Sequence, residues 1–172
     1  MSRLWAAATV LTLVAASCAK QSVLNTEADR IEVERALRRW PAVLQAYDYD
    51  GVAALIDSST VWIEHSPPTP IATAIAIFRT LDSADVVIRY GELRNLQITV
   101  HGDVAWAHWL VNGTFTTDTD AGRAWFRSFI GTTDVRQHEW RFNWVESAVM
   151  RRSNGQWRFA FGHTTRLSAS PT

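Results

Sequence analysis

The sequence lacks the residue patterns on which many common functional sites are built. Cys18 is its only cysteine, so the chain can form no disulfide within itself. Its five histidines show neither a His-x-His nor a His-x-x-x-His spacing, and there is no Gly-x-Ser-x-Gly, no phosphate-binding loop and no dinucleotide fingerprint. We therefore expect no metal site and no cofactor.

An excess of charge of one sign is also missing. Lysine and arginine together number 17, aspartate and glutamate together number 17, and the basic residues are scattered along the chain. A nucleic-acid-binding surface needs clustered positive charge. We therefore expect no nucleic-acid partner.

Tryptophan is present in excess, with nine residues in 172. Each buries a large area and needs a partner for its N–H when buried, so this number predicts an aromatic core or an aromatic cavity. We expect a small apolar or aromatic molecule as the partner of such a cavity. The candidate pocket residues are Trp40, Tyr47, Trp62, Tyr90, Trp106, Trp140, Phe142, Trp144, Phe159 and Phe161.

The N-terminal segment has the features of an export signal. A short positive start is followed by an uncharged run over residues 4–16, which is short for a bilayer span, and by small residues before Cys18. This resembles a bacterial lipoprotein signal over residues 1–17. The resemblance implies that a lipidated Cys18 begins the mature chain and that residues 18–25 form a tether. The alternative is an ordinary signal peptide cleaved at a nearby small residue.

With Cys18 lipidated, the protein would be anchored in the cell envelope, on the periplasmic or extracellular side. The lipid on Cys18 would be its only contact with the membrane.

The rest of the chain has the length of one domain, which we place at residues 26–168, with a frayed tail at residues 169–172. Apolar residues recur at helical spacing from Thr26 to Tyr47, and a short second helix ends near Ile56. Helices at the start of the chain and strands towards its end indicate an α+β fold.

Strands dominate the second half of the domain. A first strand, Thr60–His65, is ended by a proline-rich loop and followed by a helix over Ile71–Leu81. From Val86 onward, short alternating runs separated by turns predict a series of strands. The long connection at residues 117–137 contains several aromatic residues, and a short helix acting as a flap would explain its length.

The C-terminal hairpin is the most informative local pattern. Asn154-Gly155 between two alternating apolar runs predicts a two-residue turn, because both turn positions need a positive φ. An uninterrupted register from this turn places Met150 opposite Phe159, Ala148 opposite Phe161 and Glu146 opposite His163. The sequence thus predicts a titratable pair on an aromatic face.

The chemistry of this pair has two interpretations. Glu146 and His163 could transfer a proton near neutral pH, as isomerisation, dehydration or cyclisation needs, or they could be a buried hydrogen-bonded pair that fixes the sheet register. Glu64 and His65 lie near the predicted cavity mouth, and at most one of them enters the pocket because adjacent strand residues face opposite ways.

The order of elements resembles the nuclear transport factor 2 (NTF2)-like superfamily, in its SnoaL-like and kinase association-domain branches. The features that carry the resemblance are Trp40, Asp50 before Ala53-Ala54-Leu55, Val61-Trp62-Ile63, Gly102-Asp103-Val104-Ala105-Trp106, and Glu146 through Asn154-Gly155-Gln156-Trp157 to His163-Thr164-Thr165. The resemblance implies a cone-shaped, curved antiparallel sheet wrapped around N-terminal helices and enclosing a pocket. It also implies a homodimer through the outer face of the sheet. Ala148 stands where the association domain carries a cavity arginine.

Three functions are compatible with these features, because this superfamily contains both enzymes and non-enzymes. The first is a membrane-tethered protein that binds a small molecule in a largely apolar conical pocket. The second is an isomerase, dehydratase or cyclase with Glu146 or His163 as its base. The third is an envelope interaction or dimerisation module without turnover. A dry aromatic cavity favours the first, a polar cavity with a deep acid favours the second, and a collapsed cavity favours the third.

Overall fold

The structure is a computed structural model, and it describes residues 26–64, 68–129 and 131–167. The expected signal at 1–17, the lipidation site Cys18 and the tether lie outside the described residues, and so does the tail.

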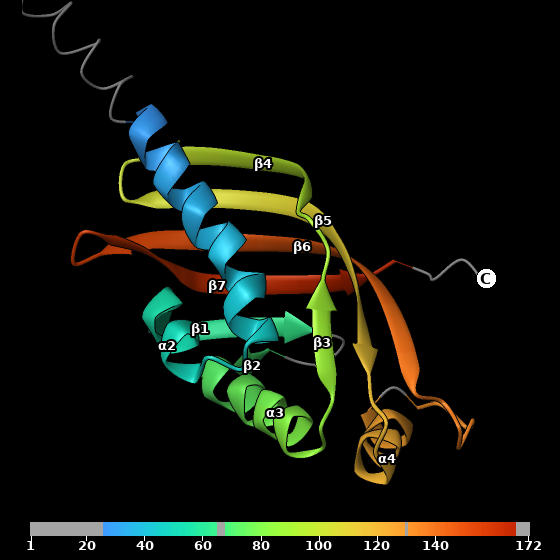
Figure 1. The fold of residues 1–172 in the computed structure, drawn as a ribbon. Coiled ribbons are helices and arrows are strands. Elements are labelled where there is room, and N and C mark those ends of the chain that lie inside the picture. Colours follow the sequence, from blue (N-terminus) through green and yellow to red (C-terminus); the bar gives the residue numbers. More distant parts are fainter. Residues whose placement is uncertain (1–25, 65–67, 130, 168–172) are drawn as a thin grey trace, which may run out of the picture.

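The first helix, residues 26–45, lies across the inner face of the sheet (Figure 1). Its apolar stripe is buried, and Trp40 packs between Trp62 and Phe159 of the sheet, with ring centroids 5.1 and 4.9 Å away. At the other end of the helix, Asp29 forms an ion pair with Arg152. The predicted helical spacing is therefore confirmed, and the stripe is the surface that joins this helix to the sheet.

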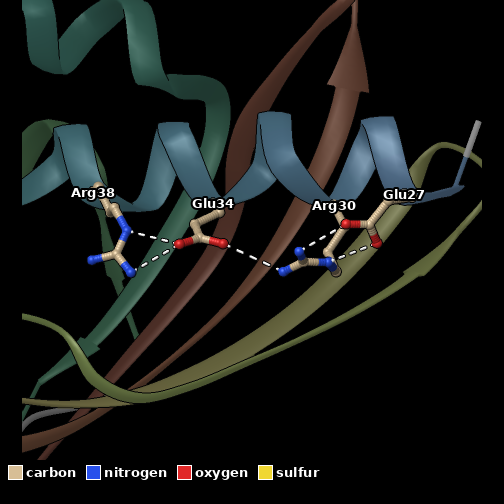
Figure 2. A network of polar contacts seen from close by, with 4 residues as sticks. All are labelled: Glu27, Arg30, Glu34 and Arg38. Carbon is tan, nitrogen blue, oxygen red and sulfur yellow. Dashed lines mark hydrogen bonds and ion pairs between the residues drawn. The ribbon is translucent and has the colours of Figure 1, made fainter.

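The solvent side of the first helix carries a ladder of ion pairs (Figure 2). Arg30 contacts Glu27 at 2.9 Å and Glu34 at 3.3 Å, and Glu34 also contacts Arg38 at 2.8 Å. The spacing of three and four residues puts these side chains next to one another on the helix surface. Solvent screens such exposed pairs and leaves each a small contribution, so packing of the apolar stripe dominates the stability of this helix.

Three further helices follow among the described residues. They are α2 (Tyr49–Leu55), α3 (Ile71–Ser83) and α4 (Asp120–Phe129). The side chain of Asp48 caps α2 by accepting a hydrogen bond from the backbone N–H of Gly51 at 2.8 Å. The helix α4 lies inside the long connection for which a short helix was predicted. No helix in the described ranges combines the length and apolar character needed to cross a membrane.

In the part of the chain that the structure describes, seven strands form one sheet, in the order β2-β1-β7-β6-β5-β3 with β4 also paired to β5 (Figure 1). Their bounds are β1 (Ile56–Glu64), β2 (Thr69–Pro70), β3 (Val87–Tyr90), β4 (Arg94–His101), β5 (Val104–Thr116), β6 (Glu139–Ser153) and β7 (Gln156–Arg166). Every pair is antiparallel except β1 with β7, which is parallel, so the curved sheet is mixed. The predicted α+β fold, with a curved sheet around N-terminal helices, is confirmed.

The predicted hairpin turn is present between β6 and β7. Asn154 and Gly155 have φ values of 51° and 74°, and Met150 lies opposite Phe159 as expected. Beyond this point the register shifts, because Ala160 is an extra residue on β7 and forms a β-bulge. The bulge exchanges the two faces of β7 for every residue that follows it.

The expected pairing of Glu146 with His163 is therefore wrong. Glu146 lies opposite Thr164, and His163 lies opposite Ser147 on the outer face. Ala148 likewise lies opposite Gly162 and not Phe161.

Packing against Trp62 gives a physical reason for the bulge. Gly162 is on the inner face, directly beside Trp62 of β1, and a Cβ at this position would lie 2.1 Å from the indole ring. Without the bulge, Phe161 would occupy this inner position and would collide with the same ring. The bulge thus presents glycine where the sheet has no room for a side chain.

We expect Gly162→Ala to lower the free energy of unfolding by about 1–3 kcal/mol, because the added methyl group overpacks the contact with Trp62. Urea denaturation measures this change, and Gln97→Ala, at an exposed position of β4, is the control. An unchanged unfolding midpoint in Gly162→Ala would contradict this account of the bulge.

Candidate ligand pocket

A cavity lies between the helices and the inner face of the sheet. Side chains from the first helix, α2, α3 and α4 and from β1, β3, β5, β6 and β7 line it. The cavity has a volume of about 70 Å³. This space holds several waters or one small organic molecule.

Aromatic rings form much of the cavity wall. Trp40 and Trp62 stack with centroids 5.1 Å apart and planes 20° apart, and Phe159 supports both from behind. On another part of the wall, Trp144 stacks against Phe142, with the ring centroids 3.9 Å apart. These stacks fix large flat surfaces in place around the cavity, as a site for an apolar or aromatic molecule requires.

Glu146 of β6 is the most buried carboxyl group of the cavity, with 3% of its surface exposed. Its Oε1 accepts one long hydrogen bond, at 3.5 Å, from the hydroxyl of Thr164, which itself accepts from the Trp62 indole at 3.0 Å. Burial, followed by the charge of Glu64, raises the pKa of Glu146 to about 8, and interactions with Trp109 and Thr164 oppose the rise. Glu146 therefore titrates near neutral pH.

Glu64 is the second carboxyl group in the lining, at the end of β1. Burial raises its pKa to about 7. At most one of Glu64 and His65 was expected to enter the pocket. Glu64 lines it, and His65 lies outside the described residues.

The sheet register places the two glutamates in one row. Glu64 of β1 pairs with Thr164 of β7, Thr164 pairs with Glu146 of β6, and Glu146 pairs with Trp109 of β5. The row crosses four neighbouring strands on the inner face. Strand spacing puts the Cα atoms of the two glutamates roughly 10 Å apart, so side chains of this length can approach one group placed between them.

Three tyrosines, Tyr47, Tyr49 and Tyr90, also line the cavity. The hydroxyl of Tyr47 donates to the backbone carbonyl of Val86, which fixes its orientation. Burial, with the charges of Glu146, Glu64 and Tyr47 as smaller causes, raises the pKa of Tyr90 well above its ordinary value. Tyr90 therefore stays protonated at neutral pH and can donate a hydrogen bond to a group in the cavity.

The structure brings together six of the predicted site residues at the cavity: Trp40, Tyr47, Trp62, Tyr90, Trp144 and Glu146. Phe142 and Phe159 are buried behind this lining, and the partly buried Trp140 stacks on Phe115. These three support the wall without lining the cavity.

Three predicted site residues lie on the outer face, which corrects their expected positions. Trp106 is 45% exposed because Ala105, Ala107 and Trp109 are the inner residues of β5. Phe161 and His163 face outward because of the bulge, and the ring Nε2 of His163 is 3.3 Å from the Thr165 hydroxyl.

Other lining residues were not predicted as part of the pocket. Trp125 of α4 lines the cavity, and its indole donates to the Thr80 hydroxyl of α3 at 3.2 Å. The aromatic content of the long connection was a usable signal for this contact. Phe115 of β5 also lines the cavity, and it shares the inner face with Trp109. No group of three or more potential metal ligands occurs within the part of the chain that the structure describes.

Comparison with known proteins gives matches at the level of structure. A proposed dehydratase of the NTF2-like family from Streptomyces avermitilis superposes with a TM-score of 0.64 at 14% identity, over 84% of this chain and 99% of that one. The fold is NTF2-like. The association domain of C. elegans CaMKII gives a TM-score of 0.60 at 14% identity, over 82% and 98% of the two chains.

An NTF2-like protein of unknown function from Rhodospirillum rubrum also matches, with a TM-score of 0.60 at 14% identity, over 78% of this chain and 98% of that one. No protein-family model and no curated protein sequence matches the chain. Identities this low establish the NTF2-like fold without assigning an activity.

We expect the stability of the protein to fall as pH rises from about 4.5 to about 8. The folded state binds the Glu146 proton up to a pKa of about 8, whereas the ordinary pKa of this group is 4.5, so folding favours proton uptake between these values. In Glu146→Gln the group cannot titrate. This variant should be more stable than wild type at pH 9, by roughly a few kcal/mol, and less dependent on pH.

Urea denaturation at pH 5, 7 and 9 measures the effect. The matched control is Glu139→Gln on the same strand, where Glu139 pairs with Arg141 away from the cavity. Equal pH dependence in wild type and Glu146→Gln would show that Glu146 does not titrate as described.

Proposed function

We propose that this protein binds a small, largely apolar molecule in the cavity between its helices and the inner face of the sheet. The observation that carries the proposal is the open cavity itself, walled by stacked aromatic rings that are held from behind by further buried rings. An interaction module without a ligand does not need this space, since a collapsed core would be more stable.

Filling the cavity tests this proposal. Ala74 of α3 lines the cavity, whereas Ala76 on the same helix is exposed and does not line it. We expect wild type to bind N-phenyl-1-naphthylamine, a neutral apolar dye, with one site per chain. Ala74→Phe should weaken binding by at least about tenfold, because its ring takes the place of the dye.

Fluorescence titration of the dye measures this affinity. Ala76→Phe is the matched control and should bind as wild type does. His163→Ala should also bind normally, because His163 is on the outer face. Failure of wild type to bind, or equal affinity in the two phenylalanine variants, would overturn the proposal.

A second candidate function is acid–base catalysis in the same cavity, of the isomerase, dehydratase or cyclase kind. The observation that favours it is that two carboxyl groups in the lining, Glu64 and Glu146, have pKa values of about 7 and 8. Groups that titrate near the working pH transfer protons most effectively. Glu146 would be the base and Tyr90 a hydrogen-bond donor, with no role for His163. The Streptomyces avermitilis protein of the same fold is itself described as a proposed dehydratase.

The tether and the oligomeric state also belong to this proposal. The sequence of residues 1–17 supports a lipid on Cys18 that holds the domain in the cell envelope. The exposed Val104 and Trp106 on the outer face support pairing of two copies, as the resemblance to NTF2-like proteins implies.

Cys18→Ser tests both ideas in one preparation. Without the lipid-bearing thiol, the variant should leave the membrane fraction when cells are lysed without detergent. Its mass in multi-angle light scattering should be that of a dimer. Membrane retention of Cys18→Ser would contradict the lipid anchor, and a monomer mass would contradict the dimer.

A further inference from the structure

We propose that the pocket selects organic amines, holding a protonated amino group between Glu64 and Glu146 and the apolar body of the ligand against the aromatic wall. This inference rests on the proposed binding function and names the chemical class of the ligand.

The first support is the placement of the carboxyl groups. Glu64 and Glu146 flank Thr164 in one row on the inner face, and both line the cavity. They are close enough for the charge of one to raise the pKa of the other. A cation between them would relieve this repulsion, whereas an anion would add to it.

The second support is that neither carboxyl group has a positive partner among the described residues that line the cavity. Among the described residues that line the cavity there is no lysine, arginine or histidine. Glu146 accepts a single long hydrogen bond although it is 3% exposed, and a carboxylate can accept about four. A buried carboxyl group this poorly satisfied is costly unless a ligand supplies donors, and an ammonium group supplies three.

The third support is the remainder of the lining. Trp40, Trp62, Trp144 and Tyr90 present aromatic rings to the same cavity. Ring faces attract cations, and the attraction grows when water is excluded. The cavity therefore offers carboxyl groups and aromatic rings together.

Other titratable groups near the two glutamates do not make the charge of the site positive. Tyr90 of β3, Tyr47 at the end of the first helix and Tyr49 of α2 line the cavity as neutral phenols. The hydroxyl of Tyr49 donates to Asp82 of α3 at 3.1 Å, and the guanidinium of Arg79 lies over the Tyr49 ring at 5.1 Å. Neither Arg79 nor Asp82 lines the cavity.

The inference predicts a linkage between binding and pH. An ammonium group favours the charged form of the glutamates, so each binding event should release a proton at a pH where the free site is protonated. The Trp109 indole opposite Glu146 favours the charged form of this carboxyl group, so it helps to hold the carboxylate that an ammonium group would bind. Amine affinity should therefore rise as pH increases from 6 to 8.

Calorimetric titration with three ligands of similar shape tests the inference: 2-phenylethylamine, the neutral 2-phenylethanol and the anionic 3-phenylpropanoate. At pH 8 we expect the amine to bind at least about tenfold more tightly than the alcohol, and the anion to bind more weakly than both. At pH 6 the advantage of the amine should shrink. Titration in buffers of different ionisation enthalpy should show the proton release.

Two variants test whether the preference for the amine depends on the two carboxyl groups. Glu64→Gln and Glu146→Gln should each lose most of the preference for the amine while still binding the alcohol. Glu139→Gln, on β6 but away from the cavity, should keep the wild-type preference. Thermal melts of each variant show whether it is folded, and Glu64→Gln tests the inference independently if Glu146→Gln is not.

The outcomes separate this inference from the function on which it rests. The amine inference is overturned if amine and alcohol bind with equal affinity, or if the preference for the amine survives both glutamine substitutions. The proposed function still stands in that case if the dye binds and Ala74→Phe weakens its binding. Failure of the dye and of all three ligands to bind overturns both.

Discussion

The contact between Trp62 and Gly162 determines which residues of the last strand face the pocket. The Trp62 ring fills the space in which a side chain at position 162 would lie, so the strand carries an extra residue, Ala160, and presents glycine there. Trp62 then stacks on Trp40 and joins the first helix to the sheet. The same shift brings Thr164, and not His163, into line with Glu146. The cavity wall, the packing of the first helix and the row that contains the two glutamates therefore all depend on the close approach of the Trp62 ring to the backbone of Gly162.

The pKa values of the row formed by Glu64, Thr164 and Glu146 depend on the aromatic surroundings of this row. Glu146, which accepts one long hydrogen bond from Thr164, and Glu64 are carboxyl groups in a cavity walled largely by aromatic rings. Burial raises their pKa values, so at neutral pH each can be neutral or charged at little cost. The apolar wall and the titratable row are thus parts of one cavity, on which the proposed binding of a cation and the alternative of proton transfer both depend.

The sequence was a good guide wherever the pattern was local. The stripe of the first helix, the turn at Asn154-Gly155 and the helix in the long connection depend on spacing and turn chemistry within a few residues, and the structure confirms them. The expected position of His163 was wrong because the bulge at Ala160 results from contact with Trp62, which is about a hundred residues away in the chain. Trp106 was misplaced for a simpler reason. Aromatic type alone predicts a pocket position for Trp106, whereas the neighbouring Ala105 and Ala107 are the inner residues of β5.

The first helix also sets the distance between the pocket and the start of the domain. Its 20 described residues span roughly 30 Å at the usual rise per residue. The Asp29–Arg152 ion pair lies near its beginning, whereas Trp40 and Leu44 line the cavity near its end. With a lipid on Cys18, this helix would act as a spacer, since it begins at residue 26, at the opposite end from Trp40 and Leu44 of the cavity wall. The cavity would then lie at the opposite end of the helix from the point where the domain is attached.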